Sequence, residues 1–269
     1  MVFGISTACF FPRVFTEQSI DIMAKMNVKN IEVFFSCMSE YRPVFVKELK
    51  KRIDASGLST YSVHALSLQF EPQLFSAHPR ARQEAEDIYK QVLEAASILE
   101  AKVYVFHGPA NLKRAKMLSL DYESVAKTAG HLADTAQGYR VKLAWETVHW
   151  CWYDDPAFAS NMLRHPETKN LYFTLDLKQA AQSGFDPEQY IGYAAGKLVN
   201  IHVCDYSHSD ERGIYPVLPM RGELDFSALK SALVEADYNG GVMLEVYSSN
   251  YSDYAELEDS FNSVKSFFE

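Results

Sequence analysis

The sequence lacks the features that mark an exported or membrane-inserted protein. No segment reaches the roughly 18 consecutive apolar residues that a membrane span needs. The N-terminal stretch MVFGISTACFFP has neither a basic region nor a signal-peptide cleavage pattern. The four cysteines, Cys9, Cys37, Cys151 and Cys204, are scattered and include no CxxC pair, which is typical of a reducing compartment. These absences predict a cytoplasmic protein with no membrane partner.

Nucleotide-binding and nucleic-acid-binding patterns are missing as well. No GxGxxG follows the first expected strand and no GxxxxGK[ST] occurs anywhere, so we expect no nucleotide cofactor. The net charge is −9, whereas nucleic-acid binding relies on clustered Lys and Arg to neutralise phosphates. We therefore expect a small-molecule substrate and no nucleic-acid partner. The sequence does not indicate an oligomeric state.

What the chain does contain is an alternation of strand-like and helix-like segments. Its 269 residues are 48% hydrophobic, and a (β/α)8 barrel typically needs about 250 residues. The expected strands, most of them nearly continuously apolar as buried parallel strands should be, are 2–8, 30–35, 60–66, 102–107, 141–147, 171–176, 198–205 and 241–247. The expected helices are 17–26, 44–56, 80–99, 122–137, 226–236 and 254–267, with further starts at Pro156 and Pro187.

Eight strand–helix units without a linker predict a single-domain α/β protein, a (β/α)8 TIM barrel over residues 1–269. The alternative is an open doubly wound sheet. The missing phosphate-binding glycine motifs count against that alternative.

Ligand-type side chains stand at the ends of six consecutive expected strands, the third to the eighth. They are His64, His107, Glu146, Asp176, His202 and Glu245. In a barrel the carboxyl ends of the strands meet at one face, where the active site lies. A single acid at a strand end is usually a helix cap or a loop ion pair, but six in a row are hard to explain as caps. They predict an active site at the barrel mouth.

The last four of these residues provide three carboxylates and one imidazole. Such donors suit a hard or borderline divalent cation, and three clustered carboxylates would be costly without one. We therefore expect one divalent metal ion. Mn²⁺ is favoured, with Mg²⁺, Co²⁺ or Zn²⁺ as alternatives.

Five motifs, LAWET, FTLDLKQA, IHVCD, PMRGELDFSALKSAL and VMLEVY, resemble the xylose isomerase-like barrel superfamily. That superfamily includes ketose 3-epimerases, hydroxypyruvate isomerase, inosose dehydratase, 3-dehydroshikimate dehydratase and endonuclease IV. The resemblance extends over essentially the whole chain. It implies that Glu146, Asp176, His202 and Glu245 bind one metal ion, and that Glu146 and Glu245 also act as the acid/base pair.

This set of groups suits proton transfer between adjacent carbons of a hydroxy-ketone. The reaction needs a base at one face, an acid at the other, and a cation to stabilise the enediolate oxygens. The expected function is therefore a metal-dependent isomerase or epimerase of a small sugar, sugar derivative or hydroxy-keto acid.

Other residues are expected to contact the substrate. They are His64 and His107 at the strand ends, Lys178 and Gln179 just after Asp176, Trp150 in the aromatic run VHWCWYDD, and Arg221 as an anion-binding residue in the long segment 206–224. The alternatives are that His64 and His107 are buried core histidines, that Lys178 and Arg221 are solvated, and that Trp150 only packs against other side chains. Trp152 and Tyr153 are expected to wall the pocket together with Trp150. Lys113, Arg114 and Lys116 are expected to form a solvated loop face.

Three other functions are to be weighed against an isomerase. A dehydratase of the inosose or 3-dehydroshikimate type would use the same residues. A non-catalytic barrel that binds a metal or a sugar is favoured only by Gln179, which stands where the nuclease branch has His. The nuclease branch itself is disfavoured, because the segment SHSDERGIYPVLPMRG contains no clear Asp-x-His to complete a third metal site.

Overall fold

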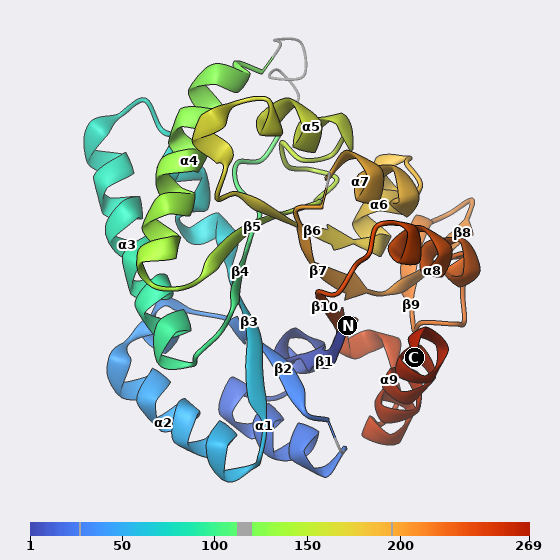
Figure 1. Ribbon diagram of the computed structural model, residues 1–269. Helices are drawn as coiled ribbons and strands as arrows, with labels where there is room; N and C mark the ends of the chain where they lie inside the picture. Colours follow the sequence, from blue (N-terminus) through green and yellow to red (C-terminus); the bar gives the residue numbers. More distant parts are fainter. Residues whose placement is uncertain (27, 112–119, 195) are drawn as a thin grey trace.

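The computed structural model describes residues 1–26, 28–111, 120–194 and 196–269. Within these residues, eight parallel strands close into a barrel (Figure 1). The barrel strands are β1 (Val2–Ser6), β2 (Asn30–Phe35), β3 (Ser59–Ala65), β4 (Val103–Phe106), β5 (Lys142–Glu146), β6 (Tyr172–Asp176), β7 (Leu198–Val203) and β10 (Gly241–Leu244). The predicted (β/α)8 fold is confirmed. The open sheet is excluded because β1 pairs with β10 as well as with β2.

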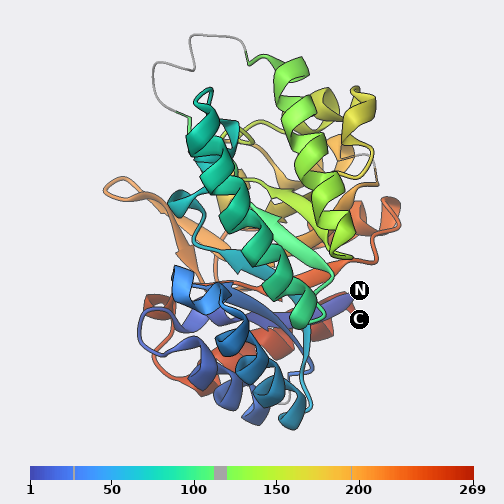
Figure 2. The same ribbon diagram turned by 90° about the vertical axis from the view of Figure 1, so that its left-hand side faces the viewer.

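Helices connect the strands and cover the outside of the barrel, as Figure 2 shows for the α3 and α4 side. They are α1 (Thr16–Lys25), α2 (Pro43–Ala55), α3 (Pro79–Ile98), α4 (Tyr122–Gly138), α5 (Ala157–Leu163), α6 (Leu177–Ser183), α7 (Pro187–Tyr193), α8 (Phe226–Glu235) and α9 (Tyr254–Phe268). Aspartates at positions 121, 225 and 253 accept backbone N–H groups at the starts of α4, α8 and α9. Within the described residues, no helix combines the length and the apolar character needed to cross a membrane.

A small cluster of buried apolar residues, Val103, Val105, Ala144 and Val199, packs with the Tyr61 ring. The opening residue of β10 is Gly241, where an added Cβ would lie 2.2 Å from the Tyr61 ring and 2.6 Å from Asn200 Oδ1. Gly241 therefore leaves the space that these two side chains occupy.

Two irregularities in strand pairing set the register of residues that matter for the site. Between β2 and β3 the register shifts after Ile31, so that Glu32 pairs with Ser62. Between β6 and β7 it shifts after Phe173, so that Asp176 pairs with His202. Each shift inserts one extra residue in one strand, as in a β-bulge.

The long segment after β7 includes regular secondary structure. It contains an antiparallel hairpin of β8 (Asp205–Ser209) and β9 (Gly213–Val217) that projects from the barrel (Figure 2). The buried Asp205 carboxylate accepts the backbone N–H groups of Tyr206, Gly222 and Leu224 and so closes the base of this excursion. The basic run 113–116 lies outside the described residues.

Candidate active site

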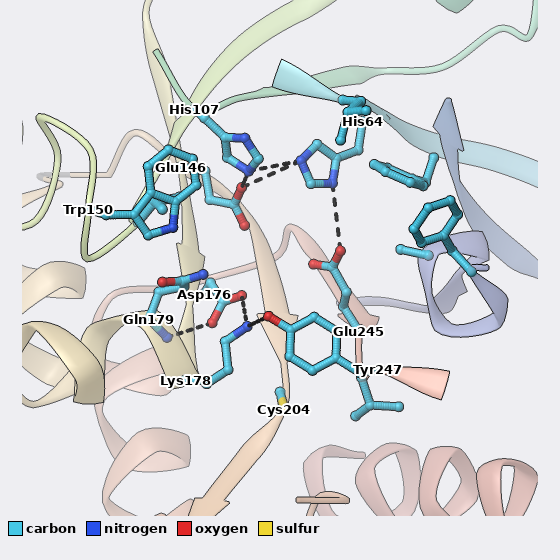
Figure 3. Close-up of a pocket in the computed structure, with 16 residues that line it drawn as sticks. His64, His107, Glu146, Trp150, Asp176, Lys178, Gln179, Cys204, Glu245 and Tyr247 are labelled. Carbon is cyan, nitrogen blue, oxygen red and sulfur yellow. Dashed lines mark hydrogen bonds and ion pairs between the residues drawn. The ribbon is translucent and has the colours of Figure 1, made fainter. Parts of the chain in front are cut away.

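The six predicted strand-end residues meet at one end of the barrel; Figure 3 shows five of them. Glu146 and Asp176 are the last residues of β5 and β6, His202 lies in β7, and Glu245 directly follows β10. One donor atom from each of these four lies within 4.8 Å of the others. The convergence follows from the parallel barrel, which brings the carboxyl ends of neighbouring strands together.

His202 is at the centre of this group and is fully buried. Its Nδ1 lies 2.7 Å from Glu146 Oε1 and also contacts Glu245 Oε2, while its Nε2 lies 3.0 Å from Glu32 Oε2. Burial alone lowers the pKa of His202, but the carboxylates of Glu245, Glu32 and Glu146 outweigh burial and raise the pKa well above its ordinary value. In the metal-free protein the imidazole is therefore a cation that holds the carboxylates together.

His64 and His107 join the same cluster from β3 and from the residue after β4. His107 Nε2 lies 2.6 Å from Glu146 Oε2 and 3.0 Å from His64 Nε2, and His64 Nδ1 lies 3.6 Å from Glu245 Oε1. Burial lowers the pKa of His64, but Glu245 and Glu146 outweigh it and raise the pKa to about 9. The two histidines thus link the two glutamates along one side of the site.

The carboxylates of the site differ in pKa. Burial raises the pKa of Glu146, but His202 and His107 outweigh it and bring the pKa below its usual range. Glu245 has its pKa held well below the usual range by His202, again against the effect of burial. For Asp176, burial dominates over the opposing charge of Lys178 and raises the pKa to about 6. The two glutamates are therefore ionised at neutral pH, where either could accept a proton.

Lys178 is buried beside Asp176 and is not a solvated lysine. Its Nζ lies 3.8 Å from Asp176 Oδ2, donates a hydrogen bond of 3.0 Å to the Tyr247 hydroxyl, and lies over the Tyr247 ring (Figure 3). Burial lowers the pKa of Lys178, but Asp176 and Tyr247 outweigh burial and raise it. The ammonium group therefore stays charged at the edge of the site.

Gln179 connects helix α6 to the loop after β5. Its backbone N–H donates to Asp176 Oδ1 at 2.8 Å, which caps α6. Its side-chain Oε1 accepts the backbone N–H of His149 and lies 2.5 Å from His149 Nδ1. Gln179 thereby fixes the loop after β5 relative to α6.

A cavity of about 290 Å³ opens above these groups. Its polar lining comprises His64, His107, Glu146, Asp176, Lys178, Gln179 and Glu245. Its apolar lining includes Phe11, Phe34, Leu66, Trp150 and Tyr247. His202 is not part of the lining and lies beneath it. The cavity therefore combines a charged floor with aromatic and aliphatic walls, as small-molecule sites commonly do.

Three predicted residues lie elsewhere. The Arg221 guanidinium pairs with Glu256 on α9 and is not part of the cavity lining. Tyr153 is buried against Phe158, and the half-buried Trp152 packs on Phe75, so neither ring lines the cavity. Of the aromatic run after β5, Trp150 is the ring that reaches the cavity. The positions of these side chains depend on loop conformation, which composition does not reveal.

One buried acid of the site was not predicted, Glu32 in β2. Its carboxylate contacts His202 from the side opposite the cavity. The available signal was a charged residue inside the apolar strand NIEVFF, because a fully buried carboxylate needs a partner. Glu32 lies in the middle of its strand, so the pattern of ligand-type residues at strand ends does not include it.

The donor set fits a divalent cation. Three carboxylates and one imidazole, all within 4.8 Å of one another, are ligands that hard and borderline divalent ions accept. Two further groups meet the same distance criterion: His64 with His107 and Glu146, and Glu32 with His64 and Glu245. The described residues could thus hold a metal, and His64, Glu146 and Glu245 each belong to two of the three groups.

Sequence comparison assigns the family. The family model of the xylose isomerase-like TIM barrel matches residues 20–267, so the chain belongs to this family. An uncharacterised protein from Mycobacterium leprae (strain TN) is 25% identical over 280 residues, which cover 95% of this chain and 92% of the relative.

Solved structures of similar fold include three with a named activity or ligand. D-psicose 3-epimerase with D-tagatose from Clostridium cellulolyticum H10 has a TM-score of 0.77 and 18% identity, covering 100% of this chain and 98% of that chain. The apo form of 3-keto-D-glucoside 4-epimerase from E. coli has a TM-score of 0.76 and 16% identity, covering 99% of each chain. The IOLI protein with a bound zinc atom has a TM-score of 0.75 and 19% identity, covering 99% and 96%. These likenesses establish the fold.

Proposed function

We propose that the protein is a divalent-metal-dependent isomerase or epimerase of a small sugar, sugar derivative or hydroxy-keto acid. One observation carries the proposal: Glu146, Asp176, His202 and Glu245 converge from four strands beneath a single cavity, with donor atoms within 4.8 Å of one another. The fold shared with sugar 3-epimerases, a sugar 4-epimerase and a zinc-containing relative supports it.

The four side chains would hold the cation. When bound, a divalent ion supplies positive charge beside two neighbouring substrate oxygens and so lowers the free energy of an enediolate. Mn²⁺ is our first choice, with Mg²⁺, Co²⁺ or Zn²⁺ as alternatives.

Glu146 and Glu245 would carry the proton. They belong to strands that are not neighbours in the barrel, and both contact His202 Nδ1, so they flank the cavity floor from two directions. With pKa values below the usual range, each is ionised and able to act as the base. The glutamate that has removed a proton could return it to the adjacent carbon, which would be isomerisation, whereas delivery to the opposite face would require the other glutamate first to take up a proton from solvent.

The remaining lining residues would bind the substrate. His64, His107 and Lys178 present polar groups to the cavity, from which the hydroxyl and carbonyl oxygens of a sugar could accept hydrogen bonds. Trp150 offers an aromatic face of the kind that stacks on sugar rings. A substrate the size of a monosaccharide or cyclic polyol suits a cavity of about 290 Å³.

The test combines metal analysis with isotope exchange. The purified protein should contain a divalent metal, and in D2O it should incorporate deuterium next to the carbonyl of a ketose from a panel that includes D-tagatose. Glu146→Gln and Glu245→Gln should each reduce exchange by about 10²- to 10⁴-fold, the usual size of a general acid–base contribution.

The matched control is Glu94→Gln, the same chemical change at an exposed position of α3, which should leave exchange unchanged. If the protein holds no divalent metal and both site variants leave its activity intact, the proposal is wrong. Loss of water from a cyclic polyol or a dehydroshikimate-like acid would instead identify a dehydratase. Binding without any exchange at a bound ketose would indicate a non-catalytic barrel.

A further inference from the structure

The buried carboxylate of Glu32 has an arrangement that the proposed reaction does not explain. Glu32 lies in the middle of β2 and is fully buried. One of its oxygens, Oε2, lies 2.7 Å from Ser62 Oγ, 3.3 Å from Asn200 Nδ2 and 3.0 Å from His202 Nε2. A carboxylate is rarely buried completely unless it is paired, so three polar contacts to one oxygen indicate a defined role.

Local strand geometry produces these contacts. The register shift after Ile31 places Ser62 beside Glu32. Asn200 and His202 are two residues apart in β7, so their side chains point to the same side of the strand. The inward faces of β2, β3 and β7 thus converge on one point beneath the cavity floor.

Contact with Glu32 fixes which nitrogen of His202 faces the cavity. A neutral imidazole carries its proton on one nitrogen and a lone pair on the other. If one nitrogen donates its N–H to an acceptor, the other nitrogen has the lone pair and can bind a metal. If Nε2–H donates to Glu32, the Nδ1 lone pair points to the space shared with Glu146 and Glu245. Metal-bound histidines usually donate their second N–H in this way, most often to a carboxylate or a carbonyl.

We propose that Glu32 is a positioning residue of the metal site, which holds His202 so that Nε2–H is donated to Glu32 and Nδ1 binds the cation. The inference rests on the proposed function only in requiring that a divalent metal binds at this cluster. It assigns a role to a residue that neither lines the cavity nor stands at a strand end.

Glu32 could instead be a metal ligand itself, since its carboxylate approaches His64 and Glu245 within 4.8 Å. The hydrogen bonds favour positioning, because Ser62 and Asn200 both direct donors to the same oxygen that meets His202. A ligand role would use the other oxygen, Oε1, which has no hydrogen-bond partner among the described residues, and it would not require Nε2–H of His202 to be donated to Oε2.

Histidine NMR on the wild-type protein separates these arrangements. Protein labelled with ¹⁵N in its histidine rings is titrated with Zn²⁺, which is diamagnetic, and the His202 signals are assigned by their loss in His202→Asn. Long-range ¹H–¹⁵N correlations should show Nδ1 bound to zinc and Nε2 protonated. Zinc bound to Nε2, or a His202 ring that binds no zinc, would overturn the proposal. This test uses the wild-type protein and needs no Glu32 variant.

Mn²⁺ titration calorimetry on variants measures the effect of the contact. Glu32→Gln should weaken Mn²⁺ binding by about 10- to 100-fold, the usual effect of changing a residue that orients a metal ligand. Glu32→Asp keeps the charge but withdraws the carboxylate by one methylene, so it separates positioning from simple charge attraction. Positioning predicts weaker binding in both variants, and wild-type affinity in Glu32→Asp would overturn it.

The matched control is Glu40→Gln, because Glu40 is also buried but its carboxylate bonds to Ser36 and Cys37 and is not part of the cavity lining or of the metal-binding groups. It should leave the Kd for Mn²⁺ unchanged while showing the same folded circular-dichroism spectrum. If the Glu32 variants do not fold, the NMR result on the wild type decides.

The outcomes also separate this inference from the proposed function. Wild-type metal binding without isotope exchange would reject the isomerase and leave the role of Glu32 standing. Normal exchange with unchanged affinity in both Glu32 variants would reject the role of Glu32 alone. A wild-type protein that binds no divalent metal would reject both.

Discussion

Asp205→Asn tests whether one buried carboxylate closes the base of the β8–β9 excursion. Asp205 is 1% exposed. Its Oδ1 accepts the N–H groups of Tyr206 and Leu224 at 2.7 and 3.1 Å, and its Oδ2 accepts that of Gly222 at 2.8 Å. Asparagine has the same shape, but one of its two terminal atoms is a donor. One side of the group must then face a backbone N–H that it cannot accept.

The magnitude follows from these contacts. In the better orientation, the amide oxygen keeps Tyr206 and Leu224, and the hydrogen bond from Gly222 is lost. A hydrogen bond to a charged group contributes about 1.5–3 kcal/mol, so we expect a loss of about 2 kcal/mol. Because 1.4 kcal/mol corresponds to a factor of ten, the equilibrium constant for local opening should rise about 30-fold.

Amide hydrogen exchange is the assay, since it reports opening residue by residue. Protection should fall about 30-fold at Gly222 and at Glu223, whose N–H pairs with the Tyr206 carbonyl. Amides of β4, on the other side of the barrel, should keep their protection. The control is Asp225→Asn at the start of α8, where a single oxygen accepts both N–H groups and asparagine caps as well as aspartate. Unchanged protection at Gly222 in Asp205→Asn would refute the reasoning.

Two further predictions concern the metal site and the packing of α4. Mn²⁺ binding should release about one proton at neutral pH and should tighten as pH rises. The pKa of His202 is raised, so its proton must leave before Nδ1 can bind a metal. Calorimetry in buffers of different ionisation enthalpy measures the number of protons released, and a value of zero would contradict the prediction. Gly130→Ala should destabilise the fold by about 1–3 kcal/mol, because its Cβ would lie 2.4 Å from the Glu167 carbonyl oxygen. Gly138→Ala, at the end of the same helix with nothing within 4 Å, should instead stabilise by up to about 1 kcal/mol; thermal unfolding compares the two, and equal effects would argue against the steric cause.

The residues at strand ends could be found from the sequence because their positions depend on the fold of the barrel more than on the conformation of its loops. Once eight parallel strands are recognised, the ends of β5, β6 and β7 must meet, and Glu146, Asp176 and His202 come with them. Their chemical roles remain proposals. The pattern of apolar strands ending in ligand-type residues survives changes of loop conformation, since backbone pairing fixes it.

The positions of loop side chains were harder to predict, because no pairing between strands of the barrel sets them. Arg221 follows β9 by only a few residues, yet its side chain turns toward Glu256. The first part of the long segment after β7 pairs with itself as a hairpin. Alternation in a short polar stretch is a weak signal, and tertiary contacts such as those of Asp205 decide the path of the chain.

Eight apolar, strand-like segments that alternate with helical ones were enough to predict the barrel and the convergence of its strand-end residues. Only the tertiary structure revealed that Glu32, from the middle of β2, meets His202 from β7 across the barrel interior. These residues are separated by 170 positions in the chain. β2 and β7 are not neighbouring strands, so the contact forms only when the closed barrel turns both side chains into its interior, which no local pattern in the sequence reveals.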